Sequence, residues 1–379
     1  MIKDLLAHCE AHSADIVPII ETLVRLESPS TDKAAVDRCG AALADLLRGA
    51  GAEVEILPQP QRGDLVRARI AGRGRPVLLL GHFDTVWPLG TLARMPLRRE
   101  GARLYGPGIF DMKAGIALAI AAARALGATG TPHPPITMLW TTDEEIGSAS
   151  SRATIESEAA RCAAVLVLEP ALPGGALKTA RKGCGEFELT VHGIAAHAGL
   201  DPGKGASAIH ELAAQIAVIE RLQDLTRGIS VNVGIVSGGS RPNVVAEVAR
   251  ATIDVRAPTR EAAEAVDAAF RGLHPTRPGT RLTLQGGFDR PPMERTEAIA
   301  GLFDRASAVA ASAGRELGEG AAGGGSDGNF TAALGLPTLD GLGAVGDGAH
   351  AAHEHVEVDT LAWRAALIAG LLASFNSSA

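Results

Sequence analysis

The sequence is poor in cysteine and aromatic residues, and it contains no long apolar run. Its four cysteines, at positions 9, 39, 162 and 184, include no Cys-x-x-Cys pair, which argues against a disulfide framework and a thiolate zinc site. The longest apolar run, residues 114–123, is far shorter than the roughly 20 residues that cross a bilayer. We therefore expect no transmembrane segment and reduced cysteines, so any metal ligands must be histidine and carboxylate side chains.

An excess of positive charge is also missing. The chain has 36 Lys and Arg against 43 Asp and Glu, which gives a net charge of -7. Proteins that hold nucleic acid through its phosphates need the opposite balance, so we expect no nucleic-acid partner. Residues 1–32 carry charges throughout and show no apolar signal segment, which predicts a cytoplasmic location.

The chain does contain a regular alternation of apolar strands and helices. Its 379 residues suit two domains. Up to residue 182, continuous apolar strands alternate with helices, as in an α/β sheet that is covered on both faces. From 183 to 290 the order becomes strand, helix, strand, strand, helix, strand. We therefore predict a discontinuous catalytic α/β domain, residues 1–182 and 291–379, with a mixed sheet flanked by helices and an inserted ferredoxin-like (βαββαβ) domain, residues 183–290.

Histidine and carboxylate residues follow several of the predicted strands or tight turns. They are His82 and Asp84, Asp111, the run 143–145, Glu169, and His350. Ligands of open α/β sheets bind outside the carboxyl ends of the strands, so we expect these side chains to converge. Imidazole and carboxylate donors without thiolate suit catalytic zinc or a related divalent ion, and the surplus of carboxylates indicates two ions.

Each signal alone also has an ordinary structural explanation. A single loop histidine such as His82 is more often exposed or hydrogen-bonded than a ligand, and the turn at this point could merely be polar. The carboxylates at 143–145 could compensate a helix dipole, and Glu169 could simply end a strand before Pro170. Only their repeated position at strand ends favours a metal site.

Six stretches, in order along nearly the whole chain, resemble the motifs of the di-zinc aminoacylase and carboxypeptidase metallopeptidases. They are "GHFDTVWPLGT", "GPGIFDMKAGIA", "TTDEEIGS", "VLEP", "GIAAHAGLDPGKGASAI" and "GGGSDGNF". This family includes acetylornithine deacetylase, succinyl-diaminopimelate desuccinylase and the folate-cleaving glutamate carboxypeptidases. The first two stretches are most similar to the glutamate carboxypeptidase branch.

The resemblance implies roles around the first of two zinc ions per subunit, for which Co²⁺ or Mn²⁺ could substitute. His82 and Glu169 would bind this ion. Asp84 would lie behind His82 and orient its imidazole. Asp111 would bridge both ions, and a cis peptide bond would follow it.

The resemblance also implies the catalytic base and the ligands of the second ion. Glu144 would be the general base, and Glu145 would bind the second zinc. In "HAAHEHV" the family pattern makes His350 the expected last ligand. His353 and His355 stand close enough to remain alternatives.

The substrate-binding residues are implied by the same resemblance. His197 of the inserted domain would reach the partner subunit's site in a homodimer and polarise the scissile carbonyl. The alternative is that His197 is an ordinary loop histidine without a role in catalysis. Asn243 and Arg290 would hold a carboxylate or carbonyl of the substrate, although Arg290 could equally be an exposed arginine. The Gly-rich stretch would present backbone N–H groups before a helix as an anion cradle; its residues are Gly324, Gly325 and Ser326.

The implied activity is zinc-dependent hydrolysis of an amide bond next to a free carboxylate. The substrate would be a small molecule, either an N-acyl amino acid or a peptide, with glutamate as a candidate C-terminal residue. A deacetylase or desuccinylase would differ only in the acyl pocket. Two alternatives belong to other classes of protein: a catalytically silent binding protein and a metal-dependent dimerising scaffold. The presence of Glu144 favours an enzyme, because a binding protein has no use for a general base.

Overall fold

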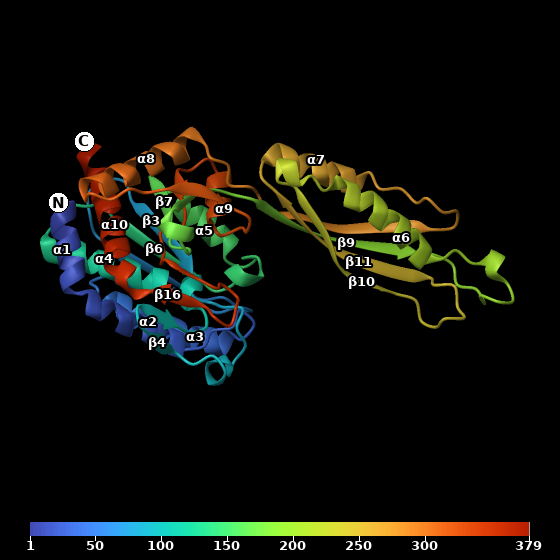
Figure 1. Ribbon diagram of the computed structural model, residues 1–379, viewed down its shortest axis with the longest axis horizontal. Coiled ribbons are helices and arrows are strands. Elements are labelled where there is room, and N and C mark those ends of the chain that lie inside the picture. Colours follow the sequence, from blue (N-terminus) through green and yellow to red (C-terminus); the bar gives the residue numbers. More distant parts are fainter. Residues whose placement is uncertain (379) are drawn as a thin grey trace. The chain divides into compact units, whose positions relative to one another are not determined.

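The computed structural model describes residues 1–378, and the chain divides into two compact units (Figure 1). Unit 1 contains Met1–Thr179, Arg295–Ala322 and the residues from Ser326 onward. Unit 2 contains Ala180–Glu294 and Gly323–Gly325. The limits of unit 2 lie a few residues outside the predicted range 183–290, and unit 2 takes in part of the Gly-rich stretch that we expected in the catalytic domain.

A six-stranded mixed sheet forms the centre of unit 1, in the order β1-β2-β6-β3-β7-β14. Its strands are β1 (Glu53–Leu57), β2 (Leu65–Ile70), β3 (Val77–His82), β6 (Ile136–Thr141), β7 (Ala164–Val167) and β14 (Thr338–Leu339). Strand β3 runs parallel to both β6 and β7, with Val77 opposite Ile136 and Ala164. The carboxyl ends of these three strands therefore meet at one edge of the sheet.

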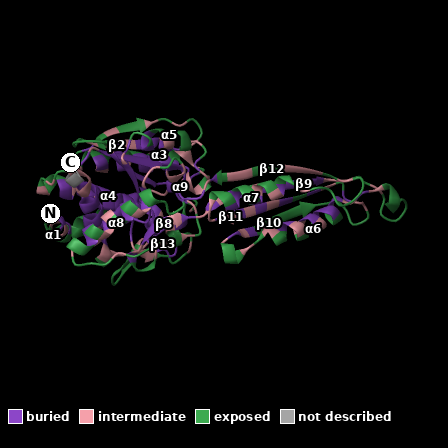
Figure 2. Cartoon of the chain, turned by 90° about the horizontal axis from the view of Figure 1, so that it is seen from above, coloured by how far each residue is buried: buried purple, intermediate pink, exposed green. Residues whose placement is uncertain are grey.

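Helices cover both faces of this sheet, which explains why β3 and β6 are buried along their whole length. The helices of unit 1 are α1 (Ile2–Ala11), α2 (Ile16–Arg25), α3 (Lys33–Arg48), α4 (Ala114–Thr129), α5 (Arg152–Ala159), α8 (Glu297–Ser312), α9 (Gly328–Ala333) and α10 (Leu361–Ser374). Val77 and Leu79 pack into the core that contains α4 and α10, whereas Leu78 and Leu80 face α5 and α9. Figure 2 shows the buried residues concentrated in these layers.

Short strands form two further small sheets. One has the order β15-β16-β5-β4, and the other pairs β13 with β8. Their bounds are β4 (Arg98–Glu100), β5 (Arg103–Tyr105), β8 (Leu177–Arg181), β13 (Glu319–Ala322), β15 (Gly346–Asp347) and β16 (His355–Glu357). The first of these sheets brings the segment after His350 next to the segment before Asp111, because β16 pairs with β5.

Unit 2 is an antiparallel sheet with two helices, in the order β10-β11-β9-β12. Its elements are β9 (Gly183–His192), α6 (Ala208–Ile219), β10 (Ser230–Gly238), β11 (Val248–Ala257), α7 (Arg260–Arg271) and β12 (Arg281–Arg290). The alternating residues Phe187, Leu189 and Val191 are buried in its core with side chains of α6 and α7. The predicted α/β class with a βαββαβ insertion is confirmed.

Both helices of unit 2 begin where a hydroxyl side chain caps the first turn. Ser207 accepts the N–H of His210, and Thr259 accepts the N–H of Ala262. In the described part of the chain, no helix has the length and apolar character required to cross a membrane.

Candidate metal centre

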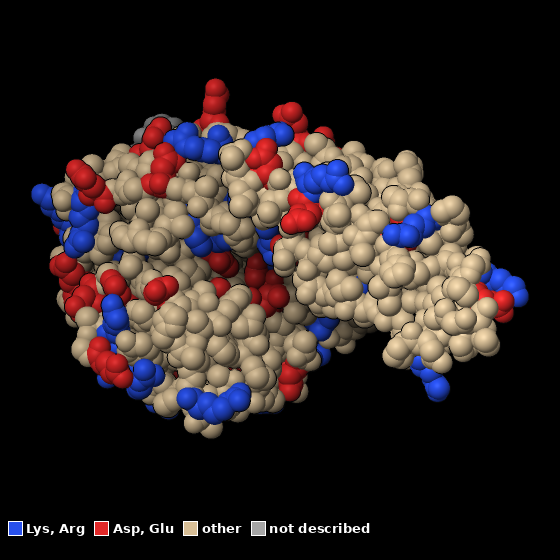
Figure 3. Space-filling view, turned by 45° about the vertical axis from the view of Figure 1, so that its right-hand side comes forward, with Lys and Arg blue, Asp and Glu red and all other residues tan. Residues whose placement is uncertain are grey.

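The parallel strands of unit 1 deliver the predicted residues to one edge of the sheet. His82 is the last residue of β3, Glu144 and Glu145 form a tight turn just after β6, and Glu169 follows β7. Figure 3 shows several acidic side chains close together on one face of the protein. This arrangement follows directly from the parallel pairing of β3 with both neighbours.

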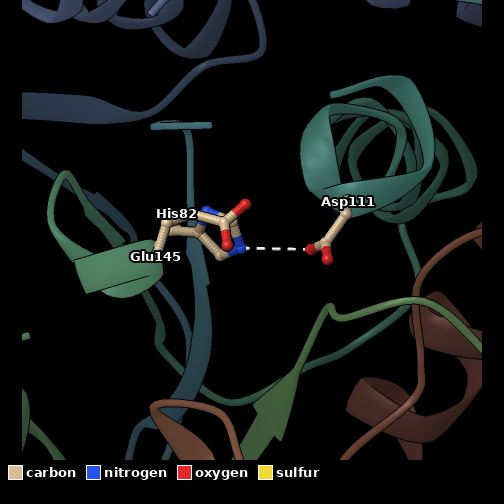
Figure 4. Close-up of side chains that lie close together, drawn as sticks. All are labelled: His82, Asp111 and Glu145. Carbon is tan, nitrogen blue, oxygen red and sulfur yellow. Dashed lines mark hydrogen bonds and ion pairs between the residues drawn. The ribbon is translucent and has the colours of Figure 1, made fainter. Parts of the chain in front are cut away.

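Two groups of potential ligands share His82. One consists of His82, Asp111 and Glu145, and the other of His82, Glu144 and Glu169, with the ligand atoms of each group within 4.8 Å of one another. The Nε2 atom of His82 lies 3.3 Å from Oδ1 of Asp111 and 3.3 Å from Oε1 of Glu169. In Figure 4, the side chains of the first group approach one another from separate elements.

His350 completes the first of these groups. Its Nε2 atom lies 3.1 Å from Oε2 of Glu145 and 3.4 Å from Oδ2 of Asp111. The backbone of His350 has a φ of 61°, a left-handed conformation that is uncommon for a non-glycine residue. A tight backbone turn therefore aims this imidazole at the two carboxylates.

The two alternative histidines lie elsewhere in unit 1. His353 and His355 line a separate cavity of about 810 Å³ together with Arg103. The His355 ring packs against Tyr105, with ring centroids 5.1 Å apart, and its Nδ1 lies 2.9 Å from the carbonyl oxygen of His353. Of the three candidates, the structure thus brings only His350 to Asp111 and Glu145.

Asp84 connects His82 to the turn that carries the two glutamates. Its Oδ1 lies 3.4 Å from Nδ1 of His82, and its backbone oxygen lies 3.0 Å from the same nitrogen. The carboxylate also accepts the backbone N–H groups of Glu144 and Glu145, at 3.4 and 3.3 Å, and the hydroxyl of Ser30 at 2.7 Å. Asp84 is fully buried, so it contacts the His82 ring and the Glu144–Glu145 turn from inside the protein.

Asp111 lies in an irregular turn just before α4. The Asp111–Met112 peptide bond is cis, as the resemblance implies. Met112 packs directly over Gly81, where an added Cβ would come within 2.4 Å of the Met112 side chain. Glycine at position 81 is therefore what allows the turn to approach the end of β3 next to His82.

The electrostatics of the centre favour positive charge. Burial alone lowers the pKa of His82, but hydrogen bonds to neighbouring carboxylates, above all Asp111, outweigh it and raise the pKa well above its usual value. The carboxylates of Asp111 and Glu145 raise the pKa of His350 to about 10. Burial raises the pKa of Asp111, but both histidines outweigh it and hold that pKa far below its usual value.

Glu145 provides a direct test of whether a cation fits. Its Oε1 atom is buried and has no hydrogen-bond partner among the described residues, while burial raises the pKa of its carboxyl. A buried carboxylate oxygen without a partner is costly unless a ligand satisfies it. This orphaned atom, together with the oxygen and imidazole donors around it, fits a divalent cation.

The predicted substrate residues His197, Asn243 and Arg290 belong to unit 2. His197 and Asn243 lie on adjacent segments, because the backbone of His197 bridges that of Val244 and the N–H of Ala198 donates to the carbonyl of Asn243 at 2.9 Å. Arg290 is buried, with 5% of its surface exposed, which excludes the alternative of an ordinary exposed arginine. The roles of all three residues stay predictions.

The Gly-rich stretch predicted as an anion cradle makes hydrogen bonds within the chain at Ser326. This residue is fully buried, its N–H donates to Oδ1 of Asn329 at 2.9 Å, and its hydroxyl donates to Asp340 at 2.7 Å. The N–H and the hydroxyl of Ser326 are thus bonded within the chain, and the anion cradle stays a prediction. Gly324 and Gly325 offer their carbonyl oxygens to Nη1 of Arg181, both at 3.0 Å.

Two buried carboxylates near the centre were not identified as candidates from the sequence. Asp327 accepts the hydroxyls of Thr141 and Ser148, which flank the turn of the two glutamates. Glu354 accepts backbone N–H groups of the Asp111 turn. Glu354 itself lies within the stretch "HAAHEHV" that identified His350, so its closeness to a proposed ligand could have been noticed.

With this geometry established, the comparisons with known proteins are informative. Residues 78–374 match the protein family described as "Peptidase family M20/M25/M40". The chain is 31% identical to carboxypeptidase G2 of Pseudomonas sp. (strain RS-16) over 369 residues, which cover 94% of this chain and 88% of that protein. It is 32% identical over 347 residues to a protein of Mycobacterium tuberculosis described as a putative succinyl-diaminopimelate desuccinylase, covering 86% of this chain and 89% of that protein.

A solved structure has the same fold. The aminopeptidase PepT of Bacillus cereus superposes with a TM-score of 0.78 at 22% identity, covering 96% of this chain and 99% of that one. The predicted resemblance and the prediction of a metallopeptidase-type hydrolase are confirmed by the family match and the sequence relatives. The chain belongs to the Peptidase family M20/M25/M40.

Proposed function

We propose that this protein is a di-zinc hydrolase that cleaves an amide bond next to a free carboxylate, in the manner of a glutamate carboxypeptidase. The observation that carries the proposal is the pair of ligand groups that share His82, with the orphaned oxygen of Glu145 in one of them. Glu169 and His82 would hold one ion, Glu145 and His350 the other, and Asp111 would bridge them. When bound, the ions would act as Lewis acids and lower the pKa of water.

Glu144 is the general base in this proposal. It stands beside Glu145 in one tight turn, close to His82 and Glu169, so it can contact a water at the centre. Its carboxylate would take a proton from the attacking water and return it to the departing nitrogen, so one residue would serve both proton transfers. The hydrogen bond from the backbone N–H of Glu144 to Asp84 ties this turn to the residue that also contacts His82.

His197 would stabilise the negative charge that develops on the carbonyl oxygen. Its Nδ1 accepts the backbone N–H groups of Gly199 and Leu200, each at 3.1 Å. This assigns the proton of the neutral ring to Nε2 and leaves that atom as a donor. An exposed imidazole with a fixed donor suits the role of an oxyanion contact supplied to the partner subunit of a homodimer.

The substrate class is tested with a panel of compounds on metal-free and zinc-reloaded protein. The panel contains N-acetyl, N-succinyl and pteroyl derivatives, with glutamate as one of the amino acids. Preferred cleavage of pteroyl-glutamate supports the carboxypeptidase proposal. Preferred cleavage of an N-acetyl or N-succinyl compound favours the deacylase alternative. The similarity to the putative desuccinylase supports this alternative. No hydrolysis of any compound by the zinc-loaded protein would support a binding protein and overturn the proposal.

A further inference from the structure

Glu354 makes an unusual set of contacts around the Asp111 turn. Its Oε1 accepts the backbone N–H groups of Phe110 and Asp111 at 2.9 and 3.1 Å. Its Oε2 accepts the N–H of Gly108 at 2.9 Å and the indole N–H of Trp87 at 2.9 Å. The side chain is fully buried, so these four donors replace water for both oxygens.

The turn needs such an acceptor because its backbone is irregular. Gly108 has a φ of 68°, and Asp111 has non-helical backbone angles (φ −115°, ψ 94°). The N–H of Ile109 donates to the carbonyl of Gly106, but those of Gly108, Phe110 and Asp111 all point to Glu354. Neighbouring backbone N–H groups that point to one spot form a concave site for an anion, and here the chain supplies its own carboxylate.

The same residue is tied to the segment that carries His350. The N–H of Glu354 donates to the carbonyl of Ala351 at 3.0 Å, and the N–H of Gly106 donates to the carbonyl of Glu354 at 3.2 Å. Glu354 thus fixes the Asp111 turn through its side chain and belongs to the His350 turn through its backbone. Asp111 and His350 are the pair whose side chains approach to 3.4 Å.

We infer that Glu354 is a positioning residue that sets the distance between Asp111 and His350 and thereby forms the site of the second cation. It touches neither substrate nor cation and acts through the backbone of the Asp111 turn. This inference rests on the proposed metal centre. Buried acceptors behind metal ligands typically change metal affinity by 10- to 100-fold when they are removed.

The test is a stepwise titration of the metal-free protein with Zn²⁺ by calorimetry, repeated with Co²⁺ and its visible absorption. Glu354→Gln keeps the size of the side chain but turns an amide NH₂ toward donors. We expect Glu354→Gln to weaken the binding of one of the two metal ions by about 10- to 100-fold. It should also change the visible absorption spectrum of the Co²⁺-loaded protein. Glu354→Asp keeps the charge on a shorter side chain and should recover part of the loss. Glu357→Gln, three residues further on in strand β16, is the matched control and should bind both metal ions as the wild type does.

The outcomes separate this inference from the proposed function. A wild-type protein that binds no cation overturns the proposed function itself. A wild type that binds two, with a folded Glu354→Gln variant that binds both equally tightly and with the same cobalt spectrum, overturns only the role of Glu354. If the Glu354→Gln variant does not fold, the Glu354→Asp variant provides the test. Weaker binding of one metal ion to Glu354→Asp supports the inference, and unchanged affinities for both ions contradict it.

Discussion

The carboxylate of Glu144 can be distinguished from those of the proposed ligands by a single substitution. Glu144→Gln removes the group that would carry the proton, so kcat should fall by about 10²- to 10⁴-fold. The content of bound metal should stay unchanged, because the other donors of the centre remain. Steady-state kinetics and elemental analysis of the purified variant check both expectations, with the exposed Glu53→Gln as control. A variant that lost metal would show Glu144 to be a ligand instead, and near-normal kcat would exclude it as the base.

The choice among the three C-terminal histidines yields a second prediction. His350→Ala should remove one of two tightly bound zinc equivalents, because this imidazole lies beside Asp111 and Glu145. His353→Ala changes a histidine three positions away that lines a different cavity, and it should retain both equivalents. Metal analysis after dialysis against a weak chelator compares the two variants. If His353→Ala lost zinc and His350→Ala did not, the proposed ligand would be wrong.

The sequence predicted where the donors of the centre would gather, but not how they are held. His82, Glu145 and Glu169 were recognisable because each follows an apolar strand. The role of Glu354 was not recognisable, because the stretch "HAAHEHV" does not show by itself whether its glutamate is a buried acceptor or an exposed charge. The hydrogen bonds of Ser326 to Asn329 and Asp340 could not be predicted either, because only the folded chain brings these residues together.

Helix α6 of unit 2 depends on a buried carboxylate, which makes unit 2 sensitive to acid. Glu211 accepts the N–H groups of Thr276 and Arg277 at 2.9 and 2.8 Å and a hydrogen bond from Gln215. Burial alone raises the pKa of Glu211, but these hydrogen bonds outweigh it and hold the pKa below its ordinary value. A carboxyl group with a lowered pKa in the folded state stabilises that state above its unfolded pKa and loses this contribution as the pH falls.

We therefore expect Glu211→Gln to destabilise unit 2 by about 1.5–3 kcal/mol near pH 7. The difference from the wild type should shrink as the pH falls below the ordinary glutamate pKa of 4.5, because the native carboxyl then becomes protonated. Urea unfolding at several pH values, monitored by circular dichroism, measures this difference in the free energy of unfolding. A difference that stays constant over this range would contradict the assignment.

Long elements were predictable and very short ones were not. The helix at 114–129 and the strands at 77–82 and 136–141 have continuous apolar runs that identify them. The sheet formed by β4, β5, β15 and β16 was missed, because strands of two or three residues are too short to show any periodicity. This small sheet is what brings Glu354 to the Asp111 turn, so missing it also concealed the role of that residue.

A homodimer in which His197 serves the partner's centre predicts complementation between two inactive variants. Glu144→Ala and His197→Ala should each be nearly inactive alone. After mixing under conditions that exchange subunits, half of the molecules are hybrids with one intact site, so about a quarter of the wild-type activity should return. The double variant, Glu144→Ala with His197→Ala in one chain, mixed with either single variant, should recover nothing. Absence of recovery in an exchanged mixture would place His197 in its own subunit's site or outside the mechanism.

The proposed function depends above all on two divalent cations that imidazole and carboxylate groups from separate parts of the chain would hold. The most direct measurement is the metal content of the purified protein, combined with hydrolysis of its best panel substrate before chelation, after chelation and after zinc is returned. We predict two cations per chain, loss of hydrolysis on their removal, and recovery as two equivalents of zinc are added. A purified protein that contains no such cations, and whose hydrolytic activity does not rise when zinc is supplied, would contradict the proposed function.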